Sequence, residues 1–96
     1  MYGTVARMRV KPGMESQLDA QMRAYEQLKV PGMLQSYVYR MDADPQEFYM
    51  AVIFESKEAY MANAASPEQD ARFRQMMETL ESPPEWHDGE IIQSIG

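Results

Sequence analysis

The chain of 96 residues contains no cysteine and a single histidine, His87. The absence of thiols excludes disulfide bonds, thiolate metal sites and cysteine nucleophiles. One histidine also falls short of the ligand set that zinc or non-haem iron usually requires. We therefore predict that the protein has no metal site.

Clustered positive charge and long apolar segments are absent as well. Nine Lys and Arg side chains are outnumbered by 15 Asp and Glu, which gives a formal net charge of −6. Nucleic acids and anionic membranes attract clustered basic side chains, so we predict that the protein binds neither. No segment approaches the length of a membrane-spanning helix, and the first residues lack the basic and apolar regions of a signal peptide. The sequence thus favours a cytoplasmic protein.

The residues that are present suit one small folded domain. A length of 96 residues and a hydrophobic content of 45% allow a single core, so we expect one domain over residues 1–96. Ten of the residues are methionine. Methionine is flexible and fills irregular spaces, so its abundance indicates either an adaptable core or an apolar cavity for a ligand.

The hydrophobic periodicity changes repeatedly along the chain, because alternating residues predict strands and spacings of three or four predict helices. The expected strands cover residues 2–10, 34–41, 48–54 and 86–95, and the expected helices cover 14–28, 56–64 and 66–80. This order predicts an α+β ferredoxin-like plait, βαββαβ, whose four-stranded antiparallel sheet carries helices on one face only. Ser56 and Ser66 are expected to cap helices, and Asp88-Gly89 is expected to form a bend or bulge.

The third expected strand is apolar at all seven positions from residue 48 to residue 54. In a strand with one face exposed to solvent, polar and apolar residues should instead alternate. The helices account for one set of side chains, Phe48, Met50, Val52 and Phe54. A second subunit is the simplest cover for the other set, Tyr49, Ala51 and Ile53. The sequence therefore predicts an obligate homodimer that packs through the open sheet face.

A candidate ligand pocket lies between this strand and the helices. Met50 and Phe54 point the same way because they are four residues apart on a strand. Tyr60 and Asn63 share one side of the following helix, and Arg74 lies in the long helix. If these side chains converge, they form an apolar pocket for a small planar aromatic ligand with an acidic hydroxyl or carbonyl group. The alternative is that Asn63 and Arg74 point to solvent.

Two neighbouring residues of the last strand are further candidates. Histidine is the side-chain type that ordinarily changes its charge near neutral pH, so His87 could serve as a general base or as an axial haem ligand. It could equally be a partly exposed residue at the start of a strand. Trp86 could be a platform for a substrate or an anchor in the core or interface.

Several short segments carry a resemblance to a known family. They are Val-Lys-Pro-Gly at 10–13, Val-Pro-Gly at 30–32, Phe-Glu-Ser-Lys-Glu-Ala-Tyr at 54–60 and Ser-Pro-Glu at 66–68. With these segments the chain resembles the antibiotic biosynthesis monooxygenase family of dimeric α+β-barrel proteins over its whole length. The resemblance implies a homodimer of plaits. It also implies an activity found in the family, the cofactor-independent oxygenation of phenolic, quinol or polycyclic aromatic molecules.

The resemblance also suggests roles for individual residues. In the actinorhodin-pathway type of monooxygenase, a tyrosine and an arginine match Tyr60 and Arg74, whereas Phe54 and Met50 stand in place of a tryptophan and an asparagine. Many relatives have a histidine at the position of Asn63. On this basis we expect Tyr60 to orient the substrate and Arg74 to stabilise a phenolate. Apart from the resemblance, His87 could accept the proton if its side chain reaches the cavity. The substrate contacts Met50, Phe54, Asn63 and Trp86. The alternative is a dimeric protein of the same fold that binds a small ligand without turnover.

Overall fold

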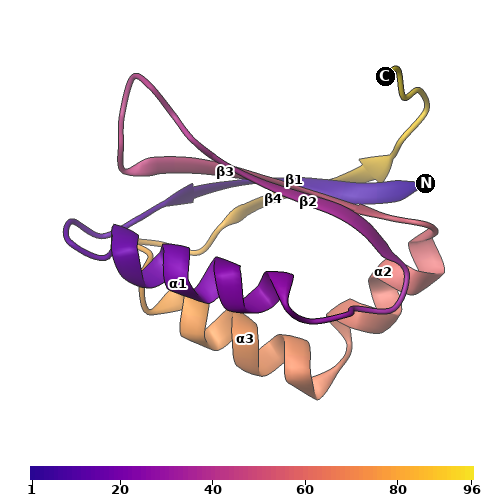
Figure 1. Cartoon of the computed structure of the whole chain (residues 1–96), viewed down its shortest axis with the longest axis horizontal. Coiled ribbons are helices and arrows are strands. Elements are labelled where there is room, and N and C mark those ends of the chain that lie inside the picture. Colours follow the sequence, from indigo (N-terminus) through magenta and orange to yellow (C-terminus); the bar gives the residue numbers. More distant parts are fainter.

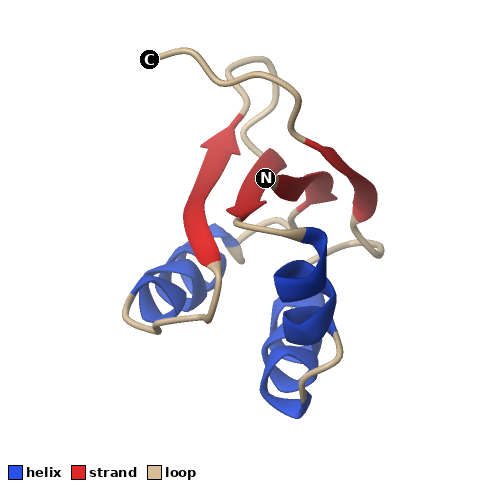
Figure 2. Ribbon diagram, turned by 90° about the vertical axis from the view of Figure 1, so that its right-hand side faces the viewer, coloured by secondary structure: helices blue, strands red, loops and turns tan.

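The computed structural model describes residues 1–96, and its elements follow the expected order (Figure 1). The strands are β1 (Tyr2–Arg9), β2 (Met33–Arg40), β3 (Glu47–Phe54) and β4 (Glu85–Glu90); the helices are α1 (Glu15–Glu26), α2 (Lys57–Ala64) and α3 (Pro67–Met77). The four strands form one antiparallel sheet in the order β2-β3-β1-β4. All three helices lie on one side of this sheet (Figures 1 and 2). The prediction of an α+β ferredoxin-like plait is confirmed.

Local signals in the sequence account for where the helices α2 and α3 begin. The side chain of Ser56 accepts a hydrogen bond of 3.1 Å from the backbone N–H of Ala59, and Ser66 accepts one of 3.1 Å from Gln69. Such caps satisfy backbone donors that the first helical turn leaves free. Both predicted caps are therefore confirmed.

None of the helices combines the length and the apolar character that a membrane span requires.

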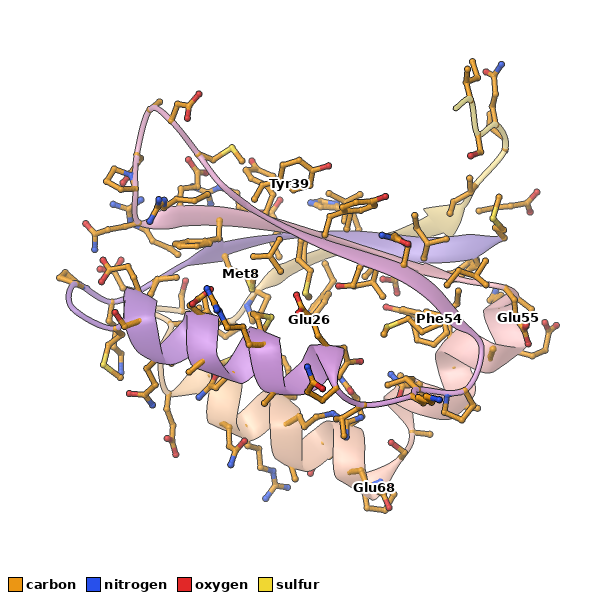
Figure 3. All side chains as sticks on the ribbon, viewed as in Figure 1. Met8, Glu26, Tyr39, Phe54, Glu55 and Glu68 are labelled. Carbon is orange, nitrogen blue, oxygen red and sulfur yellow. The ribbon has the colours of Figure 1, made fainter.

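The core lies between the sheet and the helices. Its nine buried hydrophobic residues are Ala6, Met8, Val10, Leu18, Met50, Val52, Phe54, Met76 and Leu80. Three of the nine are methionines, so part of the methionine content packs the core. Figure 3 shows Met8 and Phe54 on the helix side of the sheet, with Tyr39 on the opposite side.

The face opposite the helices is uncovered, and its centre is apolar. Val5 is paired with Ala51 of β3, and Ala51 is paired with Tyr37 of β2. Directly paired residues point to the same side of a sheet, and here they point away from the helices. Val5, Tyr37 and Tyr39 are all exposed. Tyr49, Ala51 and Ile53 of β3 thus lie on the uncovered face of a single chain, where they are partly exposed. The apolar pattern of residues 48–54 predicts this.

Two expectations for the sheet were wrong. The last strand ends at Glu90 rather than at residue 95, because Glu90 already pairs with Tyr2 at the start of β1 and the residues beyond it have no strand to join. Residues 91–96 run away from the sheet (Figure 1), and Ile92 is 91% exposed. The register of β4 is regular through Asp88-Gly89, so no bulge lies there. The irregularity lies in β2, between Met33 and Gln35.

Candidate functional site

A pocket of about 840 Å³ lies between the helix side of the sheet and the three helices. Its walls come from β1, β3 and β4 on one side and from α1, α2 and α3 on the other. Trp86 and Leu28 line it and are themselves exposed, so the pocket opens to solvent. The volume is within the range usual for small-molecule sites.

The walls of the pocket are mainly apolar. Met50 and Phe54 of β3 line it, and Phe54 is only 1% exposed. Trp86 of β4 lies opposite Phe73 of α3, with ring centroids 6.1 Å apart. Aromatic and thioether side chains of this kind suit a flat apolar ligand. Asn63 of α2 adds an amide to the lining.

Tyr60 lies at one end of the pocket in a cage of aromatic rings. Its ring centroid is 5.3 Å from that of Tyr2 and 5.5 Å from that of Phe54, the latter in an edge-on arrangement. The hydroxyl of Tyr60 donates a hydrogen bond of 2.8 Å to Oδ1 of Asp88. Burial is the largest cause that raises the pKa of Tyr60, to about 12, and the bond to the Asp88 carboxylate is the next. The Thr4 hydroxyl has a smaller effect that lowers the pKa. Tyr60 therefore stays protonated at neutral pH.

Thr4 of β1 completes this polar end. It pairs with Asp88 on one side and with Val52 on the other, and it lines the pocket. The residue is 5% exposed, and its hydroxyl faces the hydroxyl of Tyr60, whose pKa it lowers slightly. Sequence reasoning missed both Thr4 and Asp88, although Thr4 is a polar residue in line with the buried Ala6 and Met8.

Arg72 provides the guanidinium group of the pocket. Its Nη2 donates a hydrogen bond of 3.0 Å to Oε1 of Gln69, and the group lies 5.1 Å from the ring centroid of Tyr25. All three residues line the pocket. The sequence predicts Arg74 for this part. The two arginines point to different sides of α3 because successive helical residues are rotated by about 100°.

Arg74 and His87 do not line the pocket. The side chain of Arg74 is 78% exposed and pairs with Asp70 one turn earlier, at 3.0 Å. His87 pairs with Val5 on the open face of the sheet, where its Nε2 lies 2.9 Å from Oε1 of Glu85. Alternation along β4 explains this placement, since Trp86 and Asp88 face the pocket and the residue between them faces away. In the single chain, therefore, neither side chain joins Tyr60.

No group of three or more His, Cys, Asp or Glu side chains is arranged so that it could hold a metal ion. The polar groups of the pocket are hydroxyls, amides, carboxylates and one guanidinium. Such a set can hold and orient an organic ligand by hydrogen bonds.

Comparison with protein families identifies this architecture. The family model described as antibiotic biosynthesis monooxygenase matches residues 1–81. The chain belongs to this family. No curated protein matches the sequence at a significant level.

Solved structures agree with the fold of the family. A candidate antibiotic biosynthesis monooxygenase from Chloroflexus aurantiacus J-10-fl superposes with a TM-score of 0.81 and is 22% identical, over 99% of this chain and 96% of that one. A mutant of SnoaB, a cofactor-independent oxygenase from Streptomyces nogalater, superposes with a TM-score of 0.82. It is 11% identical, over 98% of this chain and 95% of that one. At these identities the likeness establishes the fold of the antibiotic biosynthesis monooxygenases and not a shared substrate.

Proposed function

We propose that the protein is a cofactor-independent monooxygenase of a phenolic, quinol or polycyclic aromatic molecule. The observation that carries the proposal is an apolar pocket, in the fold of this family, with a Tyr60–Asp88 hydrogen-bonded pair at one end. A ring substrate of this class becomes electron-rich when its hydroxyl loses a proton, and the carboxylate of Asp88 is a group of the pocket that can accept it. The anion can then reduce O₂ directly, so the reaction requires neither a metal nor a flavin.

The lining suggests how the substrate is held. Met50, Phe54 and Trp86 contact the faces of the ring, and Asn63 offers an amide to a carbonyl or hydroxyl of the substrate. Tyr60 orients the substrate hydroxyl, because its own position is fixed by its two ring contacts and by Asp88. Arg74 and His87 have no part in this arrangement within one chain.

Oxygen uptake over a panel of quinols and polycyclic phenols tests the proposal. We expect a protein-dependent rate with at least one ring class, and we expect Tyr60→Phe to lower it by about tenfold or more through loss of an orienting hydroxyl. Tyr39→Phe is the matched control because it removes the same hydroxyl from the opposite face of the sheet. Uptake no faster than in buffer, with every member of the panel, contradicts the proposal.

A second candidate function is the binding of a small apolar ligand without turnover. It is favoured by the absence of Arg74 and His87 from the pocket, and by the presence of Met50 and Phe54 where the resemblance implies hydrogen-bonding side chains. A ligand that raises the unfolding temperature without oxygen consumption supports this alternative.

We further propose that two chains form a homodimer through the open sheet face. The support is a group of apolar side chains on the uncovered face. Val5, Ala51 and Tyr37 are paired across β1, β3 and β2, and Tyr39 lies beside them on β2. Val5, Tyr37 and Tyr39 are exposed. Exposed patches of this kind commonly mark an interface between proteins.

A further inference from the structure

Arg72 is the single cationic side chain that lines the pocket, and it has no acidic partner. Arg7, Arg9, Arg23 and Arg74 differ in this respect, because each of them pairs with an Asp or Glu side chain. Arg72 is also partly buried. A partly buried charge without a counter-charge costs free energy, and a bound anion would remove that cost.

The guanidinium group of Arg72 is held in one orientation by its neighbours. Its Nε and Nη2 atoms donate hydrogen bonds of 3.3 Å and 3.0 Å to Oε1 of Gln69. The group lies 5.1 Å from the ring centroid of Tyr25, whose hydroxyl donates to the same Oε1 at 3.4 Å. The three side chains therefore connect α1 with α3. A guanidinium that is already positioned loses less conformational freedom when it binds a ligand.

These contacts occupy only one edge of the guanidinium group. Nε and Nη2 face Gln69, and no hydrogen bond within the chain uses Nη1. A guanidinium has five N–H donors, so the edge formed by Nη1 and Nη2 keeps one donor on each nitrogen for a ligand. Two parallel N–H donors match the two oxygens of a carboxylate.

We propose that Arg72 is an anion subsite of the pocket and binds a carboxylate group on the ring of the ligand. The inference rests on the proposed binding of an aromatic ring in this pocket and specifies one substituent of that ring. Nη1 and Nη2 donate one hydrogen bond to each carboxylate oxygen. Gln69 and Tyr25 are positioning residues, because they hold the guanidinium and do not contact the carboxylate.

The other charged groups of the pocket are compatible with an acidic ligand. Its lining contains two carboxylates, Asp70 and Asp88. Asp70 pairs with Arg74 at 3.0 Å, which offsets its charge. Asp88 lies on β4 in the sheet wall, whereas Arg72 lies on α3 in the helix wall. A ring with its carboxylate at Arg72 and a hydroxyl near Asp88 would span the pocket from one wall to the other.

Calorimetric titration at neutral pH with three naphthalenes that differ in one substituent tests the subsite. They are 2-naphthoate, its neutral counterpart 2-naphthamide, and 2-naphthylmethylammonium. We expect 2-naphthoate to bind at least about tenfold more tightly than either of the others, because it alone offers a negative charge and two acceptors to Arg72. An ammonium group is repelled by the guanidinium and would instead be attracted by Asp88.

Arg72→Gln should lower the affinity for 2-naphthoate about tenfold or more and change that for 2-naphthamide less than about twofold. An unchanged affinity for 2-naphthamide also verifies that the variant keeps its pocket. Arg72→Lys should retain part of the preference, since it keeps the charge and loses the paired donors.

Two other arginines supply the controls. Arg23→Gln makes the same change on α1, where the side chain is 77% exposed and pairs with Asp19 outside the pocket. We expect all three affinities to stay unchanged in this variant. Arg74→Gln makes the change two residues beyond Arg72 on α3, and we expect it to leave the preference for 2-naphthoate intact.

The possible results separate this inference from the proposed function. Equal binding of 2-naphthoate and 2-naphthamide to the wild type overturns the anion subsite, and tighter binding of the ammonium overturns it as well. A preference for 2-naphthoate that persists in Arg72→Gln, or that is lost in Arg74→Gln, overturns the assignment to Arg72. Oxygen uptake with phenols, together with equal binding of the acid and the amide, supports the proposed function and contradicts the subsite. The expected preference without oxygen uptake on any phenol supports the subsite and contradicts the monooxygenase activity. Failure of all three rings to bind overturns both.

Discussion

Replacement of Ala51 by glutamate should dissociate the proposed homodimer. Ala51 lies in the central strand β3, and its direct partners in the sheet are Val5 and Tyr37. All three belong to the face that no helix covers. On that face Arg7 is paired with Glu47, Arg9 with Asp44 and His87 with Glu85, so a new carboxylate would lack a free partner.

The expected effect is large because a two-fold interface receives the substitution twice. A buried charge without a partner costs about 3 kcal/mol or more. Two of them cost about 6 kcal/mol, which raises the dissociation constant about 10⁴-fold. A dimer with a nanomolar dissociation constant would then be largely monomeric at micromolar concentration.

Sedimentation velocity over a series of concentrations measures this change. The matched control is Ala71→Glu, which adds the same side chain at an exposed position of α3. We expect the control to sediment as the wild type does. A folded wild-type monomer at micromolar concentration would refute the proposed interface, and so would an Ala51→Glu protein that stays dimeric.

Further predictions concern Tyr60, Arg74 and the core. The folded protein holds the proton of Tyr60 more tightly than the unfolded chain does, so the stability that this group contributes is present below pH 10 and lost as the pH rises toward 12. A spectrophotometric titration should show one tyrosine with a pKa of about 12, and this tyrosine should be missing in Tyr60→Phe. If no such tyrosine is seen in the wild type, the burial of Tyr60 beside Asp88 is contradicted. Arg74→Ala should change the affinity for ring ligands less than about twofold, since its side chain is 78% exposed and does not line the pocket. A tenfold loss of affinity in calorimetry would return Arg74 to the site. Phe54→Ala should lower the free energy of unfolding by about 3–5 kcal/mol, because it empties the position of a ring that is 1% exposed. Urea denaturation at fixed protein concentration checks this value, and a loss below about 1 kcal/mol would contradict the packing described for Phe54.

The local part of the site was predictable from the sequence. Met50, Phe54, Tyr60 and Asn63 follow one another closely on β3 and α2, and strand alternation and helical spacing fix their relative directions. The structure does bring these four, together with Trp86, to one pocket. Within one chain Arg74 does not line the pocket and Arg72 does, because the pattern of α3 gives its apolar side without showing which of the two arginines reaches the pocket.

The sequence by itself determined the plait, the helix caps and the apolar character of both sides of the third strand, because periodicity and capping depend on residues that are close along the chain. It could not determine which residues of distant strands meet. The register of β4 on β1 places Asp88 opposite Thr4 and turns His87 to the open face, and a shift by one residue would exchange them. That register is set by long-range pairing and packing. The tertiary structure alone therefore decided that the polar end of the pocket consists of Thr4, Tyr60 and Asp88.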